Sequence, residues 1–190
     1  NPVGGEIRVG DSPLSAIDQK VYRDKCGVVL QDGYLFSDSL ARNIALGDEE
    51  IDMDRLSEAV RISNINEFVQ YLPLGLNTRI GAQGQGLSQG QKQRILIARA
   101  IYKNPDFLFF DEATNALDAN NEKLIMENLQ SYYHGKTVIV VAHRLSTVQN
   151  ADQIVVLENG KIVEYGTHAD LSDKQGAYYN LVKNQLELGK

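Results

Sequence analysis

The chain has 190 residues, of which 43% are hydrophobic and 23% are charged, and its formal net charge is -6 at pH 7. This composition is that of a globular domain, and an acidic chain without a dense Lys/Arg block argues against a protein that binds nucleic acid through phosphate contacts. The single cysteine, Cys26, excludes an internal disulfide and fits a reducing compartment, and neither a secretory signal nor an apolar stretch of about 20 residues is present.

The first part of the chain predicts short strands and helices. Residues 6–9 alternate in polarity and end in Gly10-Asp11, which predicts a strand and a turn. A short helix is expected over 17–25, followed by a buried strand over 26–30. Residues 38–72 predict several helical pieces, one of which opens with acids that suit the helix dipole.

The second part alternates helices with apolar strands. A long helix is expected over 88–103, because the residue before Pro105 disfavours helix. Residues 107–110 form a continuous apolar run, typical of a strand buried on both faces. A helix over 121–132 and a second apolar strand over 137–142 follow.

The last part predicts a hairpin and a terminal helix. Residues 153–157 and 161–165 flank Glu158-Asn159-Gly160, a hairpin turn signal, and 176–188 read as an amphipathic helix. The alternation of strands and helices indicates an α/β fold with a mainly parallel sheet. The helical block between the strand-bearing regions is a candidate inserted subdomain.

Polar residues follow the predicted strands, where ligands gather in an open α/β sheet. Gln31 ends the first buried strand. Asp111 and Glu112 follow the strand at 107–110, so one acid could hold Mg²⁺ and the next could activate a water. The alternative is a solvated pair that caps a turn. His143 could contact a phosphate or could be structural.

The start of the long helix has two compatible interpretations. Ser88 and Gln91 fit an S-x-x-Q capping box. Exposed N–H groups at a helix N-terminus, next to the small residue Gly90, also form an anion site.

Several motifs in register resemble the nucleotide-binding domain of ABC transporters. The signature motif is LSQGQKQR, the Walker B strand and D-loop are LFFDEATNALD, and the switch histidine lies in VAHRLSTV. A Q-loop segment, GVVLQDGYLFSDSLARNIALG, and the tail ADQIVVLENGKIVEYGTHADL are also similar. Within the family, the chain resembles exporters, in particular bacterial peptide and bacteriocin exporters.

The resemblance implies a P-loop NTPase-like (RecA-like) fold, with a mainly parallel sheet flanked by helices and an inserted α-helical subdomain. Residues 1–37 and 105–190 would form the sheet core of a partial ATP-binding domain. Residues 38–104 would form the helical subdomain that carries the signature motif.

The resemblance also implies roles for individual residues. Gln31 would contact Mg²⁺ or the attacking water and sense the transmembrane part. Asp111 would support Mg²⁺, Glu112 would be the general base, and His143 would contact the γ-phosphate of ATP.

Other implied roles concern partners. ATP held by a second, head-to-tail copy would contact the signature residues Ser88, Gln89, Gly90 and Gln91. The D-loop, 115–118, would cross the dimer interface and add Asp118 to the nucleotide-binding residues. Tyr34, Leu35 and Phe36 would lie near the coupling helices of the membrane domain.

The sequence departs from the family pattern in its phosphate-binding loop. No G-x-x-x-x-G-K-[ST] occurs, and Gly135-Lys136-Thr137 imitates only its end, because Gln130 stands where the earlier glycine is required. Residues 1–7 resemble the segment after the P-loop helix, so we expect an N-terminally truncated domain without Walker A.

Three smaller departures also occur. Gln89 replaces a usual glycine, Ala82 a usual acid and Asn115 a common serine.

The expected function of the parent protein is ATP binding and hydrolysis that powers export across a membrane. The cofactors would be ATP and Mg²⁺, and the partners a second copy and a transmembrane domain, with no nucleic acid. The parent would lie at the cytoplasmic face of the cell membrane, while the fragment alone would be soluble.

Two alternatives stay open. The isolated fragment would be a catalytically inactive module that binds little nucleotide. A soluble ABC-type ATPase that acts on DNA is disfavoured, because the chain is acidic and has no sustained heptad run.

Overall fold

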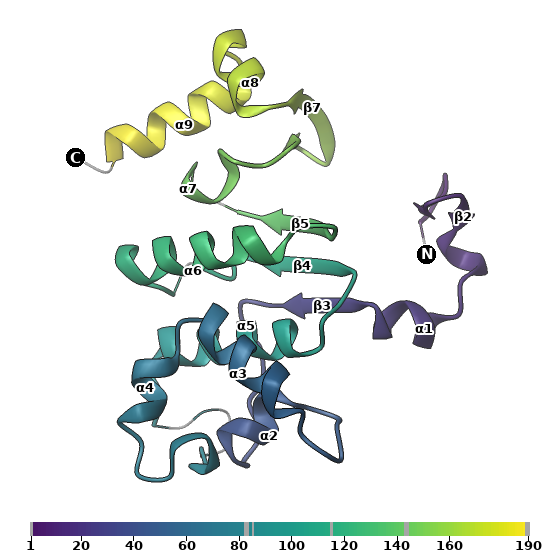
Figure 1. The fold of residues 1–190 in the computed structure, drawn as a ribbon. Coiled ribbons are helices and arrows are strands. Elements are labelled where there is room, and N and C mark those ends of the chain that lie inside the picture. The colour runs from purple at the N-terminus through teal and green to yellow at the C-terminus, as the bar shows by residue number, and fades with distance from the viewer. Residues whose placement is uncertain (1, 82–83, 85, 115, 143–144, 189–190) are drawn as a thin grey trace. The chain divides into compact units, whose positions relative to one another are not determined.

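A computed structural model describes residues 2–81, 84, 86–114, 116–142 and 145–188 (Figure 1). Within it the chain forms two compact units, Asn1–Ile139 and Val140–Lys190. The first unit contains the helical block and most of the central sheet. No helix in the described ranges is long and apolar enough to cross a membrane.

The N-terminal segment forms a small hairpin, β1 (Arg8–Val9) and β2 (Ser12–Pro13), then a 3-10 turn over Leu14–Ala16 and helix α1 (Gln19–Asp24). The predicted helix is therefore present but shorter than expected. It begins at Gln19 because the Asp18 carboxylate caps it, accepting the backbone N–H groups of the second and third helical residues at 2.8 and 3.0 Å.

The central sheet has three strands in the order β3-β4-β5, with bounds Cys26–Val29, Phe107–Asp111 and Thr137–Val141 (Figure 1). Strands β3 and β4 are parallel, and Cys26 lies opposite Phe107. The three predicted strands and their parallel character at β3 and β4 are confirmed. Each differs from its predicted bounds by a single residue at its C-terminal end.

The prediction that residues 107–110 form a strand buried on both faces holds fully for one face only: Leu108 and Phe110 are buried, and Phe107 and Phe109 are half-buried. Helix α5 (Gln89–Tyr102) covers one face of β3, where a Cβ added at Gly27 would lie 3.3 Å from the Ala100 carbonyl oxygen. Successive residues of a strand point to opposite faces, and Val28, next to Gly27 in β3, is 53% exposed. In β5, Ile139 is 50% exposed. The apolar runs therefore predicted the strands correctly, but β3 and β5 each expose apolar side chains.

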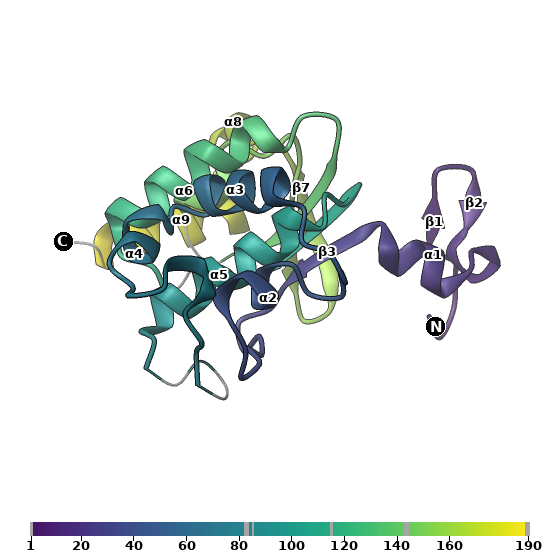
Figure 2. The ribbon, with the colours of Figure 1, turned by 60° about the horizontal axis from the view of Figure 1, so that its bottom comes forward.

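The predicted helical block is present between β3 and β4 (Figure 2). It comprises α2 (Leu40–Ile44), α3 (Met53–Ile62), α4 (Asn66–Gln70), a 3-10 turn (Gly75–Asn77) and α5. Helices α2 and α3 both pack against α5. The largest fully buried side chains of these three helices are aliphatic: Leu40, Ile44, Leu56, Ile62, Ile95 and Ile97.

Helix α6 (Ala119–Tyr132) follows β4 and belongs to the first unit. It begins two residues earlier than predicted, because Asp118 caps it by accepting the Asn121 N–H at 3.0 Å. Near its other end, the Tyr132 hydroxyl donates to the Ile101 carbonyl oxygen at 3.0 Å and so joins α6 to α5.

The second unit consists of α7 (Leu145–Val148), a hairpin of β6 (Ile154–Glu158) and β7 (Lys161–Gly166), and two helices, α8 (His168–Lys174) and α9 (Ala177–Leu188). Both turn residues, Asn159 and Gly160, have a positive φ, at 49° and 75°, which confirms the hairpin signal. The unit has its own small core: Ile154, Val156, Leu171 and Tyr178.

Helix α8 was not predicted from the sequence. Thr167 caps it and forms a capping box with Asp170, whose carboxylate accepts the Thr167 N–H at 3.2 Å. The [ST]-x-x-[DE] spacing was therefore a usable signal that the sequence interpretation passed over.

Candidate nucleotide site

The carboxyl ends of β3 and β4 bring two of the predicted residues together. The two strands pair with a constant offset from Cys26–Phe107 to Val29–Phe110. The same offset, continued past the strand ends, sets Gln31 beside Glu112. Because parallel strands end at the same edge of a sheet, residues 81 positions apart in sequence reach one site.

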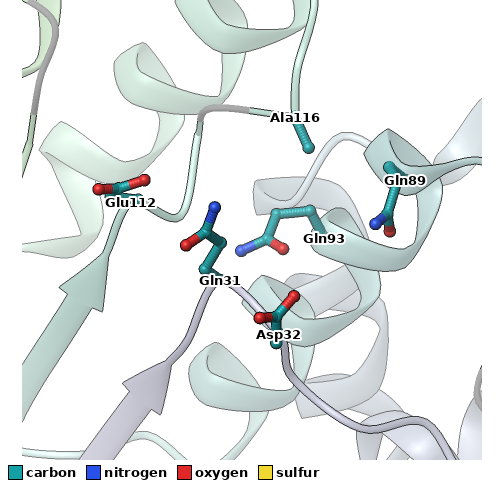
Figure 3. A pocket seen from close by; sticks show the side chains of 6 residues that line it. All are labelled: Gln31, Asp32, Gln89, Gln93, Glu112 and Ala116. Atoms are coloured by element: carbon teal, nitrogen blue, oxygen red, sulfur yellow. The ribbon is translucent and has the colours of Figure 1, made fainter.

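A pocket of about 220 Å³ lies at this edge, open to solvent. In Figure 3 the Gln93 side chain extends toward Gln31 in the middle of the pocket. Glu112 lies on the strand side and Gln89 on the helix side. The lining therefore combines residues from the ends of two strands with the first turns of α5: Gln31, Asp32, Gln89, Gln93, Glu112 and Ala116.

Glu112 has a backbone conformation that a glutamate rarely adopts. Its φ is 49°, in the left-handed region, directly after the last residue of β4. Non-glycine residues in this region are strained by about 1 kcal/mol or more, and such strain clusters at functional sites. The turn ends the strand sharply and leaves the Glu112 side chain among the pocket-lining groups. Asp111 is exposed and does not line the pocket.

The start of α5 forms the capping box that its sequence predicted. The Ser88 hydroxyl accepts the Gln91 N–H at 3.2 Å, and the Gln91 side-chain oxygen accepts the Ser88 N–H at 2.9 Å. The Ser88 hydroxyl acts here as an acceptor, so its own hydrogen can still be donated to an anion. Ser88 and Gln89 are both exposed, so the helix terminus is accessible.

Gly90 connects the helix start with the loop that follows Glu112. A Cβ at this position would lie 3.2 Å from the Ala116 carbonyl oxygen, closer than most real Cβ contacts. The lack of a side chain therefore lets the loop pass close to the first turn of α5. Ala116 lines the pocket beyond this contact.

Asp118 is used as a helix cap in this structure. Its carboxylate accepts the side-chain N–H of Asn121 at 2.7 Å and the backbone N–H of the same residue. These hydrogen bonds, that to the Asn121 side chain first, lower the pKa of Asp118 below its usual value. The carboxylate stays ionised at neutral pH and lies outside the pocket lining.

Arg94 fixes the middle of α5 to the start of α6. Its Nη1 donates to the Asn64 carbonyl oxygen at 2.7 Å and to Asn121 Oδ1 at 3.2 Å. Burial lowers the pKa of Arg94 from its usual value, and the nearby Asp118 opposes that effect. The residues after Glu112 are therefore tied to the helix that carries the signature sequence.

The predicted site residues thus divide into three groups. Gln31, Gln89 and Glu112 line one pocket, as expected for a common site. The remaining described residues lie in the flanking elements, outside the lining: Ser88, Gly90, Gln91, Asp111 and Asp118. His143, Asn115 and Ala82 lie outside the described residues.

Gln93 is a pocket residue that the sequence interpretation missed. Its side chain is buried, and its Nε2 donates to the Leu30 carbonyl oxygen at 3.4 Å, just before Gln31. Positions four apart share a helix face, so its spacing from Gln89 was the available signal. Asp32, adjacent to Gln31, was also not named as a site residue.

The donor atoms of the pocket fit a hard cation. Within the described residues, no group of three or more His, Cys, Asp or Glu side chains is arranged to hold a metal ion. Mg²⁺ in phosphate sites needs only one or two protein oxygen ligands besides water and phosphate. The Gln31 amide and the carboxylates of Asp32 and Glu112 supply such oxygens.

Comparisons with known proteins agree on one family for this chain. A family model described as ABC transporter matches residues 1–115. Over 187 residues, 98% of this chain, the sequence is 47% identical to the exotoxin translocation ATP-binding protein PaxB of Pasteurella aerogenes and to the toxin RTX-III translocation ATP-binding protein of Actinobacillus pleuropneumoniae. The chain spans about a quarter, 26%, of the length of each.

A solved structure supports the same assignment. The structure of a bacterial Atm1-family ABC exporter with ATP bound matches with a TM-score of 0.93 and 36% sequence identity. The match covers 98% of this chain and 33% of the exporter chain. It confirms the predicted α/β, P-loop NTPase-like fold.

Proposed function

The chain belongs to the ABC transporter family, and from that premise we propose that the protein carrying it hydrolyses ATP to drive export across a membrane. The relatives are named for toxin translocation and for export, which favours outward transport. Hydrolysis would take place at the cytoplasmic face, where ATP is available. The observation that carries the proposal is the pocket in which Gln31 and Glu112 meet the first turns of α5.

The chemistry follows from the position of Glu112. A carboxylate can accept a proton from a water molecule while that water attacks the γ-phosphorus of ATP. The bond from the γ-phosphorus to the β–γ bridging oxygen breaks, and the products are ADP and inorganic phosphate. Glu112 is proposed as this general base, because its left-handed backbone projects the side chain into the pocket directly beyond β4. Gln31, opposite it, would orient the water.

Mg²⁺ is the proposed cofactor of ATP. Gln31, in the pocket, and Asp111, outside the lining at the end of the neighbouring strand β4, are the residues proposed to hold it, because both side chains carry oxygen ligands. When bound, the ion supplies positive charge that offsets the charge on the phosphates.

The signature residues are proposed to act on ATP held by a second copy. Ser88, Gln89, Gly90 and Gln91 begin α5, where N–H groups and the helix dipole favour an anion. The exposed Ser88 hydroxyl would donate to the γ-phosphate. In a head-to-tail pair, each nucleotide would meet Glu112 of one copy and Ser88 of the other.

Two further residues complete the proposed nucleotide site. Asp118 would lie at the interface between the copies while it caps α6. His143 is proposed to contact the γ-phosphate.

The helical block is proposed to form the link to the membrane part. Residues 38–104 would be the helical subdomain, and residues 1–37 and 105–190 the sheet core. Tyr34 and Phe36, at the junction, are exposed and would contact the transmembrane domain.

The 190 residues alone are expected to bind little nucleotide. They contain no G-x-x-x-x-G-K-[ST], the loop whose backbone N–H groups and lysine hold the phosphates. Calorimetry with Mg-ATP on this chain tests the expectation. Micromolar binding would contradict it.

The central experiment replaces Glu112 by Gln in the full-length protein. We expect ATP hydrolysis to fall by about 10²-fold or more, because the amide cannot accept a proton at neutral pH. ATP binding should persist. Glu127→Gln is the matched control, since Glu127 is an exposed acid on α6 that pairs only loosely, at 4.0 Å, with Lys123. Unchanged hydrolysis in the Glu112 variant would refute the assigned role.

A further inference from the structure

Arg99, in the third turn of α5, makes three hydrogen bonds to the segment that follows Gln31. Its Nε donates to the Asn43 carbonyl oxygen at 2.7 Å and its Nη1 to the Tyr34 carbonyl oxygen at 2.8 Å. Its Nη2 lies 3.2 Å from Asn43 Oδ1. One guanidinium group therefore binds two backbone positions nine residues apart, one in the segment before α2 and one within α2.

Asn43 extends this arrangement to Phe36. The side chain of Asn43 is fully buried, and its Oδ1 accepts the Phe36 N–H at 2.8 Å. Its Nδ2 donates to the carbonyl oxygens of Phe36 and Ser39, both at 3.0 Å. The backbone donor and acceptor of Phe36 are thus both held by one amide, which is in turn held by Arg99.

The segment fixed in this way presents two aromatic rings to solvent. Tyr34 is 49% exposed and Phe36 is 45% exposed, and their ring centroids lie 5.0 Å apart in an edge-to-face arrangement. Leu35, between them, is fully buried and anchors the segment. The Arg99 guanidinium carbon lies 5.9 Å from the Phe36 ring centroid. The aromatic pair is therefore held next to α5, through the contact of its Phe36 ring with Arg99.

The interactions of Arg99 are unusual for a cation. It forms no salt bridge within the part of the chain that the structure describes, and its hydrogen bonds go to neutral carbonyl and amide oxygens. Burial lowers its pKa from the usual value. A lysine could not reproduce the contacts, because an ammonium group is a point charge without the planar fork that reaches several acceptors at fixed positions.

We propose that Arg99 is a positioning residue that couples the aromatic segment 34–36 to the nucleotide-facing end of α5. The helix is a continuous rod, and its start at Gln89 lies about 15 Å from Arg99 at 1.5 Å per residue. Movement of the helix start on nucleotide contact would therefore move the Tyr34–Phe36 pair as one body. This inference rests on the proposed function, in which that pair contacts the membrane domain.

Hydrogen exchange in the full-length exporter tests the coupling. The non-hydrolysable analogue AMP-PNP is added with Mg²⁺, and exchange is followed in residues 34–39 and in residues 88–94. In the wild-type protein, we expect slower exchange in both segments. In Arg99→Lys, exchange in residues 88–94 should still slow when AMP-PNP is added. The protection of residues 34–39 should be about tenfold smaller than in the wild-type protein, because charge-assisted hydrogen bonds are lost. The KM for ATP should stay within about twofold, since Arg99 touches no nucleotide group.

Arg55→Lys serves as the matched control. Arg55 also stacks on a ring, that of Tyr102 at 5.3 Å, but its ion pair is with Asp52, the N-cap residue of α3. Arg55→Lys should leave the exchange responses of residues 34–39 and residues 88–94 to AMP-PNP unchanged. A wild-type response of residues 34–39 in Arg99→Lys would overturn the inference.

The outcomes separate the two proposals. If the wild-type protein shows no response in residues 88–94, the proposed nucleotide contact fails, and the coupling fails with it. If Arg99→Lys does not fold, Phe36→Leu replaces it, because Phe36 is 45% exposed and the substitution removes the ring beside the guanidinium. In Phe36→Leu, the slowing of exchange in residues 34–39 on addition of AMP-PNP should be about threefold smaller than in the wild-type protein. The same slowing as in the wild type overturns the coupling.

Discussion

The two ends of helix α5 are held in opposite ways. At the N-terminal end, Ser88 and Gln91 satisfy each other in a capping box, and Ser88 and Gln89 are exposed. At the other end, buried side chains and hydrogen bonds fix the helix to its neighbours: Ile95, Leu96, Ile97, Ala98, Ala100, Ile101 and Tyr102. One rigid helix thus has an end that can meet a ligand and an end that cannot move independently of its surroundings.

This difference shows which residues of α5 stabilise the fold and which are available for function. A fully buried aliphatic side chain contributes several times more to stability than a helix cap, which is worth about 1 kcal/mol. Groups at the exposed end can therefore serve chemistry at little cost to the fold. Substitutions at three positions, Ile97, Tyr102 and Ser88, test whether the two ends differ in this way.

The largest effect on stability is expected at Ile97. Ile97→Ala removes a fully buried side chain and should lower the free energy of unfolding by about 2–5 kcal/mol. Urea denaturation of the 190-residue chain measures it. The paired variant Gln89→Ala, at the exposed end, should change the free energy by no more than about 0.5 kcal/mol. An equal loss of unfolding free energy in the two variants would show that the two ends of α5 contribute equally to stability.

A smaller effect is expected at Tyr102. Its hydroxyl donates to Asp48 Oδ2 at 2.8 Å and accepts the Asp52 N–H at 3.0 Å. Tyr102→Phe should lower the free energy of unfolding by about 1–2 kcal/mol, because both partners lose a hydrogen bond. Tyr71→Phe, on a largely exposed ring, is the control in the same denaturation experiment. A neutral result for Tyr102→Phe would mean that water replaces the hydroxyl.

Of the positions Ile97, Tyr102 and Ser88, the smallest effect on stability is expected at Ser88, where the effects on stability and on function can be separated. Ser88→Ala should cost about 1 kcal/mol, and Ser88→Asp should cost almost nothing because aspartate also caps helices. In the full-length protein, however, Ser88→Asp should greatly reduce ATP hydrolysis, since its carboxylate would repel the γ-phosphate. Melting curves measure the stability of the two Ser88 variants, and phosphate release from the same preparations measures their ATP hydrolysis. Normal hydrolysis by Ser88→Asp would indicate that the cap is only structural.

The same division explains what the sequence could predict. The capping box at Ser88 is a local pattern, and the bounds of α5 followed from it and from Pro105. The convergence of Gln31 and Glu112 also followed, because each ends an apolar strand of one parallel sheet. These features depend on neighbours in sequence or on a general rule of α/β folds.

The features that escaped prediction depend on packing between distant residues. The role of Gln93 arises from its contact with the Leu30 carbonyl oxygen, 63 positions away. The contacts of Arg99 with Tyr34 and Asn43 are equally remote in sequence. The half-exposed face of β3 was missed because an apolar run indicates a buried strand without saying which side is covered.

The central claim is that each ATP is shared by Glu112 of one copy and Ser88 of the other. Two variants of the full-length protein, Glu112→Gln and Ser88→Arg, should each be inactive when expressed alone. A mixed pair would contain one site with both residues intact. Co-expression should therefore restore about a quarter of the wild-type rate of ATP hydrolysis if the copies associate at random. Activity no higher than that of either variant alone would contradict the account.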